Sequence, residues 1–225
     1  QASFEGFEEG VKNVMLWHRK RYEATADGGM QEVPEMLPIS EVVSVPEDYE
    51  VAMEAALGGR LQVLLTENQD LSLGAIDYLK DNNTGRSSFL SANADDSQSS
   101  EQSTPSGEGF VNLLTDVVSA PDKYSQSVQL LLNKVAIVDS VRTALRMRPA
   151  YPGWTFVTKD GDTLSADGVL TGGAQDSADS GILKRKREIQ DLSQKKEEWA
   201  GKLALATTAL EKLEKQLKQI DTEIE

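Results

Sequence analysis

The sequence predicts a mixed α/β protein of the α+β class, in which a body of two duplicated subdomains is followed by a long coiled-coil helix. Three observations predict this architecture. A nine-residue segment occurs twice, and similar patterns follow each copy. A polar stretch rich in serine and acidic residues separates the two copies. The last 45 residues lack proline and repeat their apolar residues at heptad spacing.

Four segments are expected along the chain. At 225 residues it can form one sizeable core or two small ones. We predict the first subdomain at residues 1–90, a flexible polar connection at 91–109, the second subdomain at 110–180 and the coiled-coil arm at 181–225. The connection has no large apolar side chain with which to form a core, so we expect it on the surface.

The duplicated segment is EVVSVPEDY at Glu41–Tyr49 and DVVSAPDKY at Asp116–Tyr124. Five of its positions are identical, and two more are acidic in both copies. Together with the residues that follow, each copy predicts a strand, a helix started by proline and a buried strand. A further helix is expected near 71–80 after the first copy and near 141–148 after the second. Chance similarity is the alternative, and the matching order of elements favours duplication.

A β-hairpin and a glycine-rich segment follow the second copy. Residues 154–158 and 162–165 have strand-like composition, and the pair Asp160-Gly161 between them predicts the turn. Beyond the hairpin, three glycines lie at 168, 172 and 173 in a segment otherwise suited to a strand. Glycine in a strand marks a bulge or a close approach by another backbone, and an ordinary loop is the alternative. An edge with such small side chains can pair with another chain.

The arm has a continuous heptad pattern. Eleven of its thirteen a and d positions are apolar, and lysine and glutamate dominate the rest. A helix of this length spans about 65 Å and cannot bury a two-per-heptad stripe alone, so it requires a partner helix. A core helix packed on its own domain is the alternative. The apolar positions form the predicted coiled-coil seam: Ile182, Ile189, Leu192, Trp199, Leu203, Ala206, Leu210, Leu213, Leu217, Ile220 and Ile224.

Charge is unevenly distributed along the chain. The net charge is −14, and residues 22–183 contain 25 acidic against 9 basic side chains. Positive charge is concentrated at residues 18–21 (HRKR) and 184–187 (KRKR), on either side of the acidic body. Each basic run can be a solvated helix face, but their position at the two ends of the body favours a shared role.

The sequence contains no motif that predicts an enzyme active site in this segment. There is no cysteine, the single Gly-Lys pair lies in the arm without the other phosphate-loop residues, and no G-x-S-x-G elbow occurs. His18 is the single histidine and lies among basic residues, so neither catalysis nor metal binding is expected there. We predict no catalytic and no metal site. The sequence also shows no signal peptide and no membrane span, which predicts a soluble, intracellular protein.

The assembled pattern resembles the hinge of the structural maintenance of chromosomes (SMC) proteins, particularly the bacterial homodimeric type. EGFEEGVKNVM is similar to the segment where the incoming coil meets the hinge, and VPEDYEVAMEAALGGRLQVLLTE is similar to the core of the first subdomain. FVTKDGDTLSADGVLTGG resembles the late strand pair with its glycine motif, and GILKRKREIQDL resembles the exit into the returning coil. These stretches occur in the family's order and span nearly the whole body.

The resemblance implies homodimerisation through edge strands, an arm paired with an antiparallel coil of the same longer chain, and a role in chromosome condensation and segregation in the cytoplasm, on the nucleoid. ATP and magnesium are expected only at the distant ATPase heads, with no cofactor and no membrane partner in this segment. The implied dimer interface is Gly168, Val169, Leu170, Thr171, Gly172 and Gly173. Non-specific DNA contact is implied for Lys184, Arg185, Lys186 and Arg187, with Arg19, Lys20 and Arg21 as the other side. A coiled-coil-tethered dimerisation module without a DNA role is the alternative.

Two departures from the family pattern affect these expectations. The incoming coil is almost absent, which suggests a piece of a longer protein. The body is strongly acidic, so DNA contact is expected only at the root of the arm. The pair Gly58-Gly59 is expected to end a helix and turn the chain rather than to form an interface.

Overall fold

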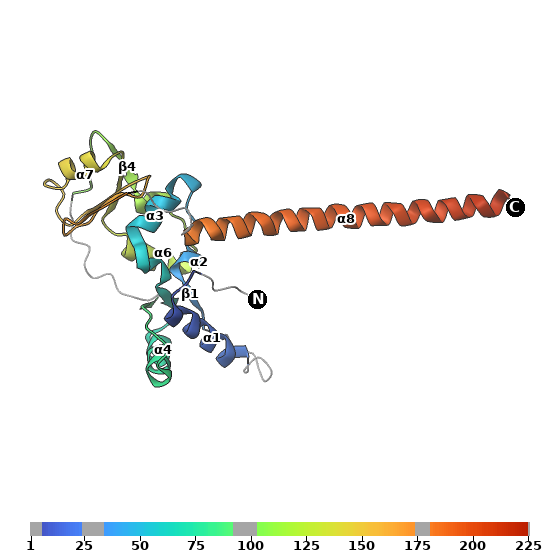
Figure 1. Cartoon of the computed structure of the whole chain (residues 1–225), viewed down its shortest axis with the longest axis horizontal. Coiled ribbons are helices and arrows are strands. Elements are labelled where there is room, and N and C mark those ends of the chain that lie inside the picture. Colours follow the sequence, from blue (N-terminus) through green and yellow to red (C-terminus); the bar gives the residue numbers. More distant parts are fainter. Residues whose placement is uncertain (1–5, 24–33, 92–102, 174–180, 225) are drawn as a thin grey trace. The chain divides into compact units, whose positions relative to one another are not determined.

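The computed structural model describes residues 6–23, 34–91, 103–173 and 181–224. The chain divides into two compact units, Gln1–Leu183 and Lys184–Glu225, which are described separately below. The mixed α+β fold and the long terminal helix are both confirmed (Figure 1).

The first copy is built on a three-stranded sheet, β1-β2-β3. Strand β1 runs antiparallel to β2, and β3 runs parallel to β2 after a helical crossover through α4. Helices α1 and α4 contact each other and pack on the sheet around Val14, Leu64 and Ala75, all fully buried. The elements are α1 (Glu9–Glu23), β1 (Met36–Pro38), β2 (Leu64–Thr66), α4 (Gln69–Asn82) and β3 (Phe89–Ser91).

The second copy is built on a five-stranded sheet, β4-β5-β6-β7-β8. It repeats the first arrangement, because β4 is antiparallel to β5 and β6 is parallel to β5 after a crossover through α7. The predicted hairpin is confirmed as β6 and β7, and β8 then pairs antiparallel with β7. The elements are β4 (Phe110–Leu113), β5 (Val135–Val138), α7 (Val141–Met147), β6 (Thr155–Thr158), β7 (Thr163–Leu164) and β8 (Leu170–Thr171).

The helices predicted after the prolines are confirmed, but the strand predicted at the start of each duplicated segment is wrong. The Val-Val pairs favour a strand by local propensity. In the structure a single helical turn buries Ile39 in one copy and Leu114 in the other, and only Ser44 and Ser119 keep extended pairing. The elements are α2 (Ile39–Val42), η1 (Glu47–Tyr49), α3 (Glu50–Leu57), η2 (Gly58–Gln62), α5 (Leu114–Val117) and α6 (Asp122–Leu132).

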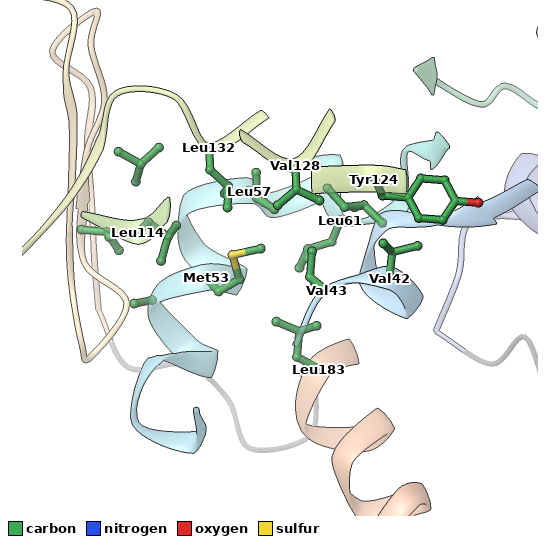
Figure 2. Close-up of a cluster of buried hydrophobic side chains, with 14 of the residues drawn as sticks. Val42, Val43, Met53, Leu57, Leu61, Leu114, Tyr124, Val128, Leu132 and Leu183 are labelled. Carbon is green, nitrogen blue, oxygen red and sulfur yellow. The ribbon is translucent and has the colours of Figure 1, made fainter. Parts of the chain in front are cut away.

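One hydrophobic core joins the two copies. Figure 2 shows Met53 and Leu57 of α3 packed among Leu114, Val128 and Leu132 of the second copy. Each copy also has a smaller buried cluster of its own, so the first unit contains a core shared between the copies and one further core in each copy. The predicted connection at 91–109 lies mostly outside the described residues, and the subdomain boundaries stay a prediction.

The second unit is a single long helix. Helix α8 (Ile182–Ile224) has 43 residues, and its first two belong to the body unit. Leu183 is only 4% exposed and packs in the central core. Its backbone N–H donates to Glu54 Oε1 at 2.8 Å, which satisfies one of the free donors of the first helical turn. None of the helices in the described ranges is long and apolar enough to cross a bilayer.

Candidate dimer interface and basic segments

Strand β8 forms one end of the five-stranded sheet. Leu170 pairs with Leu164 and Thr171 with Thr163, and no described strand pairs with the other side of β8. Val169 is 57% exposed and Leu170 is 52% exposed. An edge strand with free backbone groups and exposed apolar side chains is suited to pairing with another chain. The predicted interface segment therefore lies at an accessible sheet edge.

A hydrogen-bonded turn leads into β8. The Ser165 N–H donates to the Val169 carbonyl at 3.0 Å, and the Gly168 N–H donates to the Ser165 carbonyl at 2.8 Å. The Ser165 hydroxyl donates to Asp167, and this bond is the main cause that lowers the pKa of the Asp167 carboxyl. Gly168 has φ +95°, a conformation that glycine adopts without strain. The turn therefore reverses the direction of the chain, so that β8 runs antiparallel to β7.

The three glycines differ in their surroundings. A Cβ atom on Gly168 would lie 2.3 Å from an Arg148 nitrogen, and one on Gly172 would lie 2.2 Å from Asp162 Oδ1. At Gly173, which has φ +138°, no atom of the described residues lies within 4 Å of such a Cβ. Two of the glycines therefore leave room for side chains of their own chain, whereas Gly173 borders open space.

The sheet of the first copy has an open edge that sequence reasoning missed. Strand β3 follows β2 and α4 just as β6 follows β5 and α7, and β6 carries β7 along its outer edge. In the described part of the first copy, the outer edge of β3 has no such neighbour. The apolar pair Phe89-Leu90 between serines was the available signal, because the duplication requires a strand after the second helix of each copy.

The N-terminal basic run lies in the last two turns of α1. Lys20 and Arg21 are exposed, and the Arg21 guanidinium lies 5.4 Å from the centre of the Trp17 ring. His18 is buried at 9% exposure, and its Nε2 atom lies 2.8 Å from the Pro34 carbonyl oxygen. Burial lowers the pKa of His18, which holds the imidazole in its neutral form. Only part of this basic run therefore faces solvent.

The second basic run occupies the first turns of α8. Lys184 is exposed, and Arg185, Lys186 and Arg187 are half-buried. It belongs to the arm unit, whereas Arg19, Lys20 and Arg21 belong to the body unit. Each run therefore places at least one exposed cation on a helix, namely Lys20 and Arg21 in the first and Lys184 in the second.

The apolar stripe of α8 is exposed along the described helix. Its large side chains from Ile189 to Ile220 are 56–68% exposed, whereas Ile182 at the start is half-buried. The side chain of Ile224 lies outside the described residues. Such a stripe on a solvated helix requires a partner surface, as the heptad pattern predicts.

The described residues offer little for small-molecule chemistry. In those ranges no group of three or more histidine or acidic side chains could hold a metal ion. A cavity of about 250 Å³ lies between α1 and the start of α4, beside Trp17, Tyr22 and Asp70. This volume is below the roughly 300–1,000 Å³ of typical ligand pockets. The site with the clearest geometry is thus the open edge of the sheet.

Comparison with known proteins agrees with this geometry. Residues 36–148, half of the chain, match the family described as SMC proteins Flexible Hinge Domain. The chain belongs to the SMC hinge family.

Individual relatives extend the similarity beyond the family match. The chain is 34% identical to the chromosome partition protein Smc of Myxococcus xanthus over 197 residues, and 31% identical to that of Desulfitobacterium hafniense over 204 residues. These matches cover 86% and 88% of this chain but only 16% of each relative. The chain thus spans about a sixth of the length of these relatives.

A solved structure shows the same architecture. A crystal structure of an asymmetric dimer of the Geobacillus stearothermophilus SMC hinge domain is 28% identical, with a TM-score of 0.68. The aligned region covers 89% of this chain and 78% of the Geobacillus stearothermophilus chain. A Pyrococcus furiosus Smc hinge domain with an extended coiled coil shares the fold at 23% identity and a TM-score of 0.54.

Proposed function

We propose that this chain is the homodimerisation hinge of a chromosome partition SMC protein, and that two copies join through the open edges of their sheets. The observation that supports this most directly is the edge strand β8, in which Leu170 is exposed and which the exposed Val169 directly precedes. The dimeric state of the similar Geobacillus stearothermophilus hinge points the same way.

The duplication suggests which edges meet. In the second copy, β6 is extended by β7 and β8, whereas the corresponding strand β3 of the first copy has an open outer edge among the described residues. Strand β8 of one protomer can pair with the outer edge of β3 in its partner, where the first copy has no strand equivalent to β7 among the described residues. Twofold symmetry makes the same contact a second time, so both open edges are paired in a closed dimer.

In the longer protein, this segment joins a coiled-coil arm to distant ATPase heads. The apolar stripe of α8 pairs with an antiparallel coil from the same chain, and ATP and magnesium bind at distant ATPase heads rather than in this segment. The hinge itself performs no chemistry and joins two arms mechanically on the nucleoid. Exposure of the large apolar side chains of α8 supports the coil pairing.

DNA contact is proposed at the basic runs. Lys184 and Arg187 near the start of α8, together with Lys20 and Arg21 of α1, bind phosphate without sequence preference. The acidic body, with 25 acidic and 9 basic residues over 22–183, repels the same phosphates and confines the contact to these segments.

The same acidity favours a second candidate, a dimerisation module tethered by coiled coils that does not bind DNA. In this alternative the basic runs are solvated helix faces that improve solubility. Both candidates share the dimer and differ only in the response to DNA.

Sedimentation equilibrium tests the dimer. We expect the unaltered chain to be dimeric and the double variant Val169→Glu with Leu170→Glu to be monomeric, because dimerisation would bury two carboxylates at this strand edge without partners. Circular dichroism should show that the variant remains folded. The matched control is Leu205→Glu, an exposed leucine of α8 outside the predicted seam. A fully dimeric double variant would show that β8 is not the interface.

A DNA mobility-shift series at increasing salt separates the two candidates. Replacing residues 184–187 by glutamine should weaken the retardation seen near 50 mM salt and flatten its salt dependence, because fewer phosphate contacts remain. The control replaces Lys195, Lys196, Lys212 and Lys215 by glutamine, which removes the same amount of positive charge farther along α8. Absence of retardation by the unaltered chain, or equal loss in both variants, would remove the proposed DNA site.

A further inference from the structure

Two side chains of the body occupy the space beside the glycines that flank β8. A Cβ atom on Gly168 would lie 2.3 Å from Nη2 of Arg148, and a Cβ atom on Gly172 would lie 2.2 Å from Oδ1 of Asp162. Carbon atoms do not approach nitrogen or oxygen this closely without a bond. As long as Arg148 and Asp162 keep these positions, no side chain fits at either glycine.

Asp162 is itself fixed by the hairpin. Its N–H donates to Thr158 Oγ1 at 3.0 Å, and its carbonyl accepts the Thr158 N–H at 2.9 Å. From this anchored position its Oδ1 accepts the Gly173 N–H at 3.3 Å. The carboxylate therefore connects the rigid turn between β6 and β7 to the chain just beyond β8.

Arg148 acts at the other end of the segment. It lies beside Gly168 in the turn that leads into β8. The same turn is closed by Asp167, whose pKa is lowered chiefly by the Ser165 hydroxyl and further by the positive charge of Arg148. The start of the segment thus lies beside Arg148, the residue that follows α7.

These contacts matter because β8 is short. It has two residues and pairs with a two-residue strand, so its ladder with β7 alone holds it weakly. A strand that frays must be ordered again whenever it binds, and that ordering reduces affinity. Contacts at both ends of the segment reduce this loss.

We propose that Asp162 and Arg148 are positioning residues that hold β8 at the sheet edge in the conformation that pairs with a second copy. This inference rests on the proposed homodimer. It differs from the expectation that Gly172 is small because the partner's backbone approaches it, since here the space is filled by Asp162 of the same protomer.

The first test compares dimer dissociation constants by sedimentation equilibrium. Asp162→Ala removes the acceptor for Gly173 and should raise the Kd by up to about tenfold, because losing this bond lowers the fraction of free protomers in which β8 is ordered for pairing. Asp162→Asn keeps an oxygen acceptor at this position and should restore most of the affinity. Arg148→Ala should also weaken the dimer and speed amide exchange at Gly168 and Val169 in the monomer.

The second test is a double-mutant cycle. In the unaltered chain, Gly172→Ala should weaken the dimer because its methyl group collides with the Asp162 carboxylate. In the Asp162→Ala background the space is free, so Gly172→Ala should have little further effect. If the partner's backbone were the obstacle, Gly172→Ala would weaken the dimer equally in both backgrounds, and that result would overturn the proposal.

The outcomes distinguish this inference from the proposed function. Wild-type Kd and wild-type amide exchange at Gly173 in Asp162→Ala would refute the positioning role and leave the dimer intact. A fully dimeric Val169→Glu with Leu170→Glu variant would instead refute the interface itself. A weaker dimer in Asp162→Ala, recovery in Asp162→Asn and a non-additive cycle together would support the inference.

Discussion

Ser44 and Ser119 exchange both of their backbone hydrogen bonds across an isolated antiparallel bridge, each with an N–O distance of 2.8 Å. The two serines occupy the same position in the duplicated nine-residue segments, 75 residues apart. The two copies therefore meet at equivalent residues, as expected for units related by an internal twofold axis. Another equivalent pair, Ile39 and Leu114, is fully buried in the shared core.

The bridge gives a first prediction about stability. Ser119→Pro removes the N–H that donates to Ser44, which leaves a carbonyl without its partner and should lower the free energy of unfolding by about 1–3 kcal/mol. Urea denaturation followed by circular dichroism measures this change. Ser119→Ala keeps the backbone bonds and should stay within about 0.5 kcal/mol of the unaltered chain. Equal stability of the two variants would show that the bridge contributes nothing.

The attachment of α8 to the body gives a second prediction. Leu183→Ala creates a cavity in the central core and should lower the free energy of unfolding of the body by about 2–5 kcal/mol. Leu192→Ala, which changes an exposed leucine on the same helix, should leave the unfolding of the body unchanged. Thermal unfolding of both variants provides the measurement, and a similar small effect in both would contradict the burial of Leu183.

Glycines with different environments give a third prediction. Gly161 has φ +92°, and an added Cβ would lie 2.9 Å from Val51 Cγ1 of α3, so Gly161→Ala should destabilise the body by at least about 1 kcal/mol. Gly201 lies within α8 with no neighbour within 4 Å of such a Cβ. Gly201→Ala should therefore raise helix content and stabilise α8 by up to about 1 kcal/mol. Melting curves recorded at 222 nm compare the two, and stabilisation by Gly161→Ala would contradict the observed turn.

The buried histidine gives a fourth prediction, about pH. The folded-state pKa of His18 is lowered by burial, whereas the unfolded chain has the ordinary value near 6.5. Below that value the unfolded state binds more protons, so the stability of the fold should fall as pH decreases from 6.5 through the folded pKa. Titration of the His18 ring by NMR gives the folded pKa directly.

The control for this effect is His18→Gln. Since the chain has no other histidine, this variant should lose the part of the stability change that occurs between the folded pKa of His18 and 6.5. Carboxylates titrate mainly at lower pH and should behave alike in both proteins. An unchanged pH profile in the variant, or a folded pKa above 6.5, would contradict a neutral buried imidazole.

Much of the fold could be predicted because its signals are local. The turn pair Asp160-Gly161 predicted the hairpin, and Pro46 and Pro121 predicted the start of the helical segments that follow them. The expectation that Gly58 ends a helix is confirmed, since it follows α3 with φ +50° and its N–H donates to the Glu54 carbonyl. In each case a turn or helix end depends on a few consecutive residues.

Other features could not be predicted because they depend on distant segments. The Val-Val pairs of the duplicated segments have strand propensity, yet a helical turn there buries Ile39 and Leu114 in a core to which both copies contribute. Tertiary packing outweighs a local preference of well under 1 kcal/mol per residue. His18 lies in a basic run that predicted solvent exposure, and its contact with Pro34 buries it.

The duplication, the hairpin and the heptad stripe of the arm follow from the amino-acid sequence alone, because repeats, turn pairs and heptad spacing are visible in the order of the residues. The folded structure was needed to show that Ser44 pairs with Ser119, that no described strand covers the outer edge of β3, and that Asp162 fills the space at Gly172. These relationships depend on which residues the fold brings within a few ångströms of one another. Residue type and spacing alone do not specify such contacts.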